Sequence, residues 1–180
     1  MNVPNLITVA RILLVPLTIW LIITGQFLLA FLVFIAAGVS DAIDGFIAKR
    51  FHQTTELGSY LDPIADKLLL VSIYVALALG DHIPAWLAIL VVSRDVLIVG
   101  GVILSWLINK PIHMQPVLVS KVNTAGQILL AGAVLAVLGF GYPGHEPIFW
   151  GSLVVGVLTV ASGAVYLRDG LRHLANGHHV

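Results

Sequence analysis

Long apolar stretches dominate the chain, and Gly, Pro and clusters of polar residues interrupt them at intervals. A helix needs about 20 apolar residues to cross the hydrocarbon core of a bilayer. The interruptions predict six membrane-spanning helices, at roughly 6–24, 27–49, 58–79, 84–108, 119–140 and 147–168. Neither an internal repeat nor a long linker divides the chain. We therefore expect an all-α, polytopic membrane protein whose single domain covers residues 1–180.

Lysine and arginine residues collect on one side of these predicted spans. Lys49 and Arg50 follow the second span, Lys110 and Lys121 flank the connection between the fourth and fifth, and Arg168 follows the sixth. The three opposite connections contain no Lys or Arg. The positive-inside rule then places both termini in the cytoplasm. We expect an integral protein of a bacterial inner (cytoplasmic) membrane, with membrane lipids around it.

Composition agrees with this class and excludes others. Of the 180 residues, 59% are apolar and 10% charged, and the mean hydropathy is +1.02. Soluble domains are about half apolar and about a quarter charged. A formal net charge of zero argues against a nucleic-acid partner, and the lack of cysteine excludes thiolate metal ligands. The first residues lack a basic region and a cleavage site, so we interpret them as a retained helix.

One charged stretch, DAIDGFIAKRFHQTTELGSYLDPIADK, joins the second and third predicted spans and carries four aspartates. Asp41 and Asp44 lie near the end of the second span, and Asp62 and Asp66 near the start of the third. Spacings of three and four residues put each pair on one helical face. The pairs lie at similar depth on neighbouring antiparallel helices, so they can converge on one point.

Four such carboxylates require a partner. A lone Asp at the centre of a membrane helix costs about 2.5–3.5 kcal/mol, and close carboxylates repel one another. Divalent cations in a cavity open to the cytoplasm would offset both costs, and we expect two ions. An all-oxygen set without Cys or a nearby His favours Mg²⁺ or Mn²⁺. Two such ions form a clamp for displacement at phosphorus.

The four acids allow two other interpretations. The acids could simply cap helix ends or face water, although their spacing is regular and they lie well inside the helices. They could instead line an ion or proton pathway, as in a transporter, although no acidic relay continues outward through the later spans. Gly45, Ala48 and Gly58 lie beside the acids, where small side chains can serve helix packing or form a floor for a flat nucleotide.

These residues together resemble the signature of the CDP-alcohol phosphatidyltransferase family, D-x2-D-G-x2-A-R-x8-G-x3-D-x3-D. Every spacing fits, and one position departs, because Lys49 stands where the family has Arg. Lys49 keeps the charge but lacks the bidentate fork of Arg, and Arg50 follows directly. Six spans, with this hairpin as the second and third, are also typical of the family.

The resemblance implies an enzyme. The two metal ions would be bound by Asp41, Asp44, Asp62 and Asp66. Asp66 would also be the catalytic base that takes the proton of the acceptor hydroxyl. The CDP site would be lined by Gly45, Ala48, Lys49 and Gly58. The acceptor oxygen would attack the β-phosphorus of CDP-diacylglycerol, and CMP would leave. Members of the family are typically homodimers.

The acceptor should be recognised by polar residues of the later spans. Arg94, beside Asp95, falls inside the fourth span, and Lys121 and Asn123 open the fifth. An Arg buried in a membrane is a functional candidate, although Arg94 and Asp95 could merely pair with each other or with another span.

Within the family, phosphatidylglycerophosphate synthases resemble this chain through NLITVARILLVP. They usually carry a further Arg where this chain has Val102, and K-x-K where it has Lys121-Val122-Asn123. Glycerol 3-phosphate has a phosphate of charge near −2 that invites several cations, whereas the phosphodiester of phosphatidylglycerol needs fewer. SRDV and SKVNTA are more similar to the eukaryotic-type cardiolipin synthases. We therefore expect phosphatidylglycerol as the acceptor, with glycerol 3-phosphate as the alternative.

Overall fold

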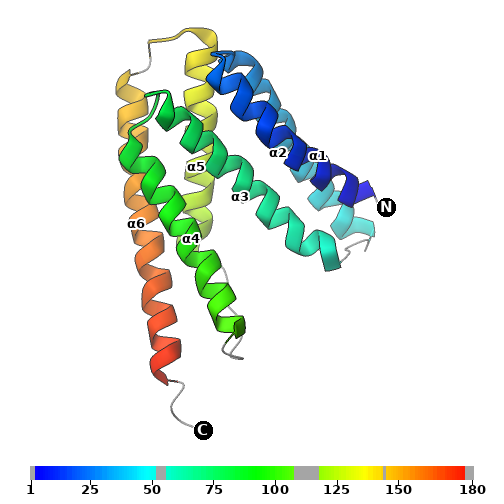
Figure 1. The fold of residues 1–180 in the computed structure, drawn as a ribbon, viewed down its shortest axis with the longest axis vertical. Helices are drawn as coiled ribbons and strands as arrows, with labels where there is room; N and C mark the ends of the chain where they lie inside the picture. The colour runs from blue at the N-terminus through cyan, green and yellow to red at the C-terminus, as the bar shows by residue number, and fades with distance from the viewer. Residues whose placement is uncertain (1–2, 52–55, 108–117, 144, 177–180) are drawn as a thin grey trace.

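Six α-helices make up nearly all of the residues that the computed structural model describes, and no strand occurs among them (Figure 1). The described residues are 3–51, 56–107, 118–143 and 145–176, with side chains over 12–40, 67–101, 118–143 and 146–168. The helices are α1 (Val3–Ile23), α2 (Phe27–Phe51), α3 (Glu56–Leu79), α4 (Ala85–Leu107), α5 (Leu118–Phe140) and α6 (His145–Asn176). The predicted all-α fold is confirmed.

Length and composition make two helical segments of the described part suitable for crossing a membrane. These are Leu118–Phe140 and Glu146–Arg168, with mean hydropathies of 1.7 and 2.0. Shorter apolar segments occur in three other helices, at Ile12–Ile23, Phe27–Ser40 and Lys67–Leu79. Many large apolar side chains are exposed, among them Leu79 at 80%. Six spans and the cytoplasmic placement of the termini stay predictions.

Tight turns end α1, α3 and α5 on one side of the bundle. Gly25 and Gly141 have φ values of 74° and 69°, and Asp81 has a φ of 57°. After α1, the Gln26 amide donates to the Leu21 carbonyl at 2.8 Å, which satisfies an end carbonyl of the helix. Glycine adopts this left-handed conformation without a steric penalty, and aspartate tolerates it better than most residues. These turns make successive helices antiparallel.

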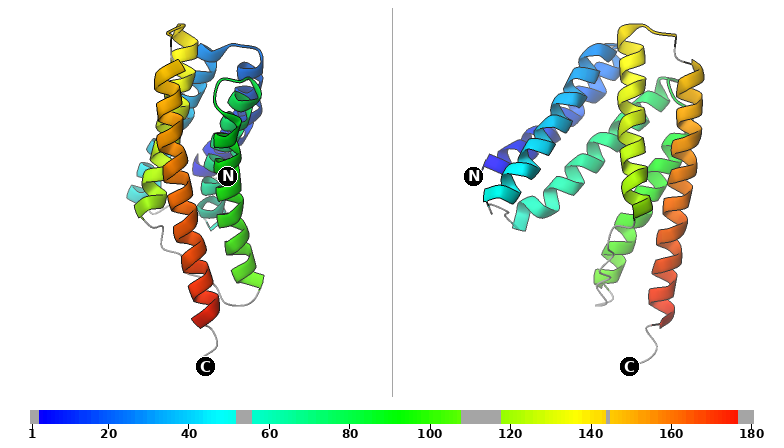
Figure 2. Two further views of the ribbon diagram at one scale, coloured as in Figure 1. Left: turned by 90° about the vertical axis from the view of Figure 1, so that its left-hand side faces the viewer. Right: turned by 180° about the vertical axis from the view of Figure 1, so that it is seen from behind.

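The helices form two groups, α1–α3 and α4–α6. Within the first group α1 contacts both α2 and α3, and within the second α6 contacts both α4 and α5. The groups touch where α5 meets α2 and α3, and where α3 meets α4. From these contacts they diverge toward the end that holds the N-terminus, the end of α2 and the start of α3 (Figure 2). We call this the splayed end.

The core of the described part centres on α3. Ile73, Tyr74 and Leu77 on one face of this helix are almost fully buried. They belong to the same buried cluster as Leu87 of α4 and Leu135 of α5. Helix α3 therefore joins the two groups, and its first residues lie at the splayed end (Figure 2).

Candidate functional site

The signature residues lie on α2 and α3, and the end of α2 and the start of α3 both point to the splayed end (Figure 1). Asp41, Asp44, Gly45, Ala48 and Lys49 belong to the last part of α2, and Gly58, Asp62 and Asp66 belong to the first part of α3. Four residues separate the two helices in the sequence, so their ends cannot lie far apart. The signature side chains lie outside the described part, and their convergence on metal ions stays a prediction. Among the side chains that are described, no cluster of three His, Asp or Glu residues forms.

A cavity of about 460 Å³ adjoins the signature positions. Among the described side chains, its lining on α2 extends to Val39, shortly before Asp41, and on α3 it includes Lys67, which directly follows Asp66. Helices α4 and α5 close the other side, so the cavity lies between the two helix groups. The described side chains that line it are Phe34, Ile35, Ala37, Gly38, Val39, Lys67, Leu69, Leu70, Arg94, Asp95, Thr124, Gln127 and Ile128.

Three charged side chains of this lining form one ion cluster, which we call the charged triad: Lys67, Arg94 and Asp95. The Oδ1 atom of Asp95 lies 2.6 Å from Nη1 of Arg94 and 3.1 Å from Nζ of Lys67. Arg94 is 5% exposed, whereas the side chain of Lys67 is 37% exposed. One carboxylate oxygen therefore links α4 to α3 across the cavity, and the triad has a net charge of one positive.

Hydroxyl groups from the neighbouring helices hold the guanidinium of Arg94. Its Nη2 donates to Oγ of Ser162 on α6 at 3.0 Å and to Oγ of Ser120 on α5. The ring of Tyr166 lies 5.9 Å from the guanidinium carbon, within reach of a cation–π interaction. The Nε atom of Arg94 is buried and has no hydrogen-bond partner among the described residues. The guanidinium is thus fixed by contacts with α4, α5 and α6.

A second polar network lies deeper between α5 and α6. Oγ1 of Thr159 lies 2.9 Å from Oδ1 of Asn123 and 3.4 Å from Nε2 of Gln127, and all three side chains are almost fully buried. Tyr74 of α3 donates to the carbonyl oxygen of Gln127 at 3.0 Å. Buried polar groups are costly unless they are hydrogen-bonded, so this network fixes how α5 packs on α6.

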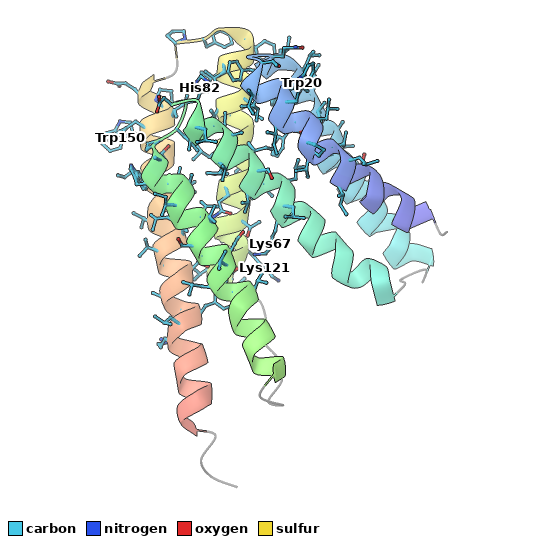
Figure 3. All side chains as sticks on the ribbon, viewed as in Figure 1. Trp20, Lys67, His82, Lys121 and Trp150 are labelled. Atoms are coloured by element: carbon cyan, nitrogen blue, oxygen red, sulfur yellow. The ribbon has the colours of Figure 1, made fainter. Side chains whose placement is uncertain are left out.

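The three predicted acceptor residues lie in different surroundings. Arg94 lines the cavity and pairs with Asp95, so the expected pairing and a place in the site occur together. Asn123 is buried against Thr159. Lys121 is exposed and follows Ser120, a partner of Arg94. Figure 3 shows Lys121 toward the splayed end, near Lys67 in that view.

Lys67 was not predicted as a site residue. A lysine directly after Asp66, at the start of an apolar helix segment, was the available signal. Thr124 and Gln127 also line the cavity and had no such signal, because a single Thr or Gln in an apolar helix is common. Their place in the lining depends on which face of α5 meets α2, and only the fold determines that.

These features define a class: a helical membrane-type protein whose charged, partly apolar cavity adjoins an acidic hairpin. The family model for CDP-alcohol phosphatidyltransferase matches residues 1–162, and the chain belongs to this family.

Similar proteins carry two names. The chain is 38% identical to a Homo sapiens cardiolipin synthase (CMP-forming), over 94% of the chain and 62% of that protein. It is 32% identical to a probable cardiolipin synthase (CMP-forming) of Drosophila melanogaster, over 94% of the chain and 58% of that protein. It is also 32% identical to a CDP-diacylglycerol–glycerol-3-phosphate 3-phosphatidyltransferase of Pseudomonas fluorescens, over 97% of the chain and 92% of that protein. The chain thus spans about three fifths of the length of the two animal relatives.

Proposed function

We propose that this protein transfers a phosphatidyl group from CDP-diacylglycerol to phosphatidylglycerol, giving cardiolipin and CMP. The observation that carries the choice of acceptor is the cavity beside the acidic hairpin. Its wall is mainly apolar, and its charged triad has a net charge of one positive. An apolar wall suits a lipid acceptor, and one net positive charge suits a phosphodiester of charge −1. The family assignment and the relatives named cardiolipin synthase support the same reaction.

In the proposed mechanism the acceptor hydroxyl attacks the β-phosphorus of CDP-diacylglycerol. Asp66 takes the hydroxyl proton, a new P–O bond forms, and the bond to CMP breaks. Gly45, Ala48, Lys49 and Gly58 line the CDP site. The signature positions belong to the last part of α2 and the first part of α3, and this supports one common place for the substrate diphosphate and the acceptor.

Asp41, Asp44, Asp62 and Asp66 would hold two ions of Mg²⁺ or Mn²⁺. Four carboxylates on two helices joined by four residues are an oxygen-only donor set that suits these ions. Bound there, the ions would offset negative charge on the diphosphate and on the departing phosphate.

The acceptor phosphate would lie against Arg94 and Lys67. Lys67 directly follows Asp66 in α3, and neighbouring side chains of a helix point about 100° apart, so a phosphate at Lys67 and the base would be separated by the reach of two side chains. In phosphatidylglycerol the free hydroxyl is separated from the phosphate by one glycerol unit. That spacer suits an acceptor whose phosphate meets Lys67 while its hydroxyl faces Asp66.

We also propose six spans with both termini in the cytoplasm, in a bacterial inner membrane, and a homodimer. The exposed apolar side chains and the two long apolar helices support a membrane setting. Trp20 and Trp150 lie toward the end opposite the splayed end, where tryptophan is typical of a membrane interface (Figure 3). The site would then open to the cytoplasm.

Purified protein in detergent, given CDP-diacylglycerol, Mg²⁺ and labelled phosphatidylglycerol, should form cardiolipin and release CMP. Chelation should abolish the release, and Asp66→Asn should lower it by about 10²- to 10⁴-fold. Asp81→Asn is the matched control, because Asp81 is exposed in a turn away from the splayed end. Labelled glycerol 3-phosphate entering lipid in place of phosphatidylglycerol would favour the alternative acceptor, which the Pseudomonas relative's name supports. Ion flux in vesicles without CMP release would identify a transporter instead.

A further inference from the structure

In the charged triad, the carboxylate of Asp95 forms ion pairs with both cations, Lys67 and Arg94. The same oxygen, Oδ1 of Asp95, contacts Arg94 at 2.6 Å and Lys67 at 3.1 Å. Asp95 is 7% exposed and lines the cavity. Lys67 and Arg94 belong to different helices, so the carboxylate lies between them as a bound phosphate oxygen would.

This arrangement limits the charge that the cavity can accept. Without Asp95, Lys67 and Arg94 would present two positive charges to a phosphate. With Asp95 they present one, because no further charged side chain lines the described part of the cavity. In a partly buried site such a change is weakly screened, so it alters the binding of a dianion more than that of a monoanion.

We propose that Asp95 is a specificity-determining residue, which makes the cavity select a monoanionic phosphodiester over a dianionic phosphomonoester. The inference rests on the proposed function, because it assigns the cavity to the acceptor phosphate. It assigns a role in recognition of the acceptor phosphate to an acidic side chain, in addition to the basic residues. The carboxylate neutralises one of the two positive charges, so the remaining net charge matches the single negative charge of a diester.

Coulomb's law gives the size of the effect. Asp95 and an acceptor phosphate separated by about 7 Å, at an effective dielectric constant of about 20–40, interact strongly enough to alter binding about 10- to 50-fold per unit charge. A dianion carries one unit more than a diester. Asp95→Asn should therefore raise the preference for glycerol 3-phosphate over phosphatidylglycerol, as a ratio of kcat/KM values, by about 10- to 50-fold.

Three variants separate charge from geometry. Asp95→Glu keeps the charge and changes only the contacts, so the preference should stay near that of the wild type even if both rates fall. The double variant Lys67→Met with Asp95→Asn restores one net positive charge, so the preference should return toward the wild-type value. Asp81→Asn removes an exposed acid from a distant turn and should leave the preference unchanged.

A binding experiment keeps this test independent of turnover. The purified protein with Mg²⁺, but without CDP-diacylglycerol, is titrated calorimetrically with glycerol 3-phosphate and with glycerophosphoglycerol, the deacylated headgroup of phosphatidylglycerol. The same 10- to 50-fold shift in the ratio of Kd values, about the Coulomb estimate, is expected for Asp95→Asn and its reversal in the double variant. If the shift occurs although no lipid product forms, the charge role of Asp95 stands and the proposed function fails. If Asp95→Asn weakens both anions equally, Asp95 only positions Arg94 and the inference is wrong.

Discussion

Arg94 provides the sharpest test of the acceptor site, because its guanidinium makes contacts that lysine cannot reproduce together. It reaches Asp95, Ser120 and Ser162 while its Nε stays free of partners in the described part. Arg94→Lys keeps the positive charge but loses the fork that spans these groups. Arg94→Met removes the charge as well and leaves Asp95 paired with Lys67 alone.

The magnitude follows from the hydrogen bonds. One bond to a charged group contributes about 1.5–3 kcal/mol, and about 1.4 kcal/mol corresponds to a tenfold change in affinity. If Arg94→Lys costs the acceptor one such bond, the KM for phosphatidylglycerol should rise about 10- to 100-fold. Arg94→Met should raise it further. The KM for CDP-diacylglycerol should stay within about threefold, a difference below 1 kcal/mol, because the residues proposed to bind CDP belong to the signature and the triad is not part of them.

The assay varies each substrate while the other is saturating, and thermal unfolding of each variant is measured alongside. Ser162→Ala serves as the control, because it removes one neutral partner of Arg94 and keeps the guanidinium. Its effect on the acceptor KM should be well below that of Arg94→Lys. Equal increases in both KM values for Arg94→Met, or a loss of stability without any change in the acceptor KM, would show that Arg94 is structural and that the cavity does not bind the acceptor.

Two further predictions concern packing. Gly139→Ala should destabilise the protein by about 1–3 kcal/mol, because the added Cβ would lie 2.8 Å from the Leu28 backbone. Gly100→Ala is the matched control, because its added Cβ enters open space, and thermal unfolding in detergent measures the stability of both variants. Thr159→Val should cost about 1–3 kcal/mol, because it leaves the side-chain oxygen of Asn123 buried without its hydroxyl partner. An unaltered unfolding temperature would contradict the assigned network.

The helices themselves could be predicted from the sequence because each apolar run is long and is bounded by a turn signal. Gly25 and Gly141 mark two of these turns, and both adopt the left-handed conformation that such signals indicate. The end of α6 was missed by eight residues, since the helix continues to Asn176 beyond the apolar run that ends near 168. Hydropathy detects only the part of a helix that suits lipid, whereas backbone hydrogen bonding continues into the polar segment.

The cavity could not be predicted in the same way. Most helices here are apolar on every side, so no stripe of polar residues indicates which face meets which neighbour. The charges in Arg94 and Asp95 were visible, and their mutual pairing was one of the expected outcomes. The link from Asp95 to Lys67 depends on α3 crossing α4 at that level, which is a tertiary contact without a local signature.

The position of the triad between the helix groups connects binding to the chemistry proposed for the hairpin. Arg94 is held within the α4–α6 group by Ser120 and Ser162, whereas Lys67 belongs to α3, one residue after Asp66. A phosphate that contacts both cations therefore bridges the two groups, as Asp95 does in the structure. Such a ligand would fix the distance between the group that holds the acceptor and the helix that carries the base. Orientation of this kind is worth most when the reacting hydroxyl belongs to the same molecule as the bound phosphate, which is the case for either candidate acceptor.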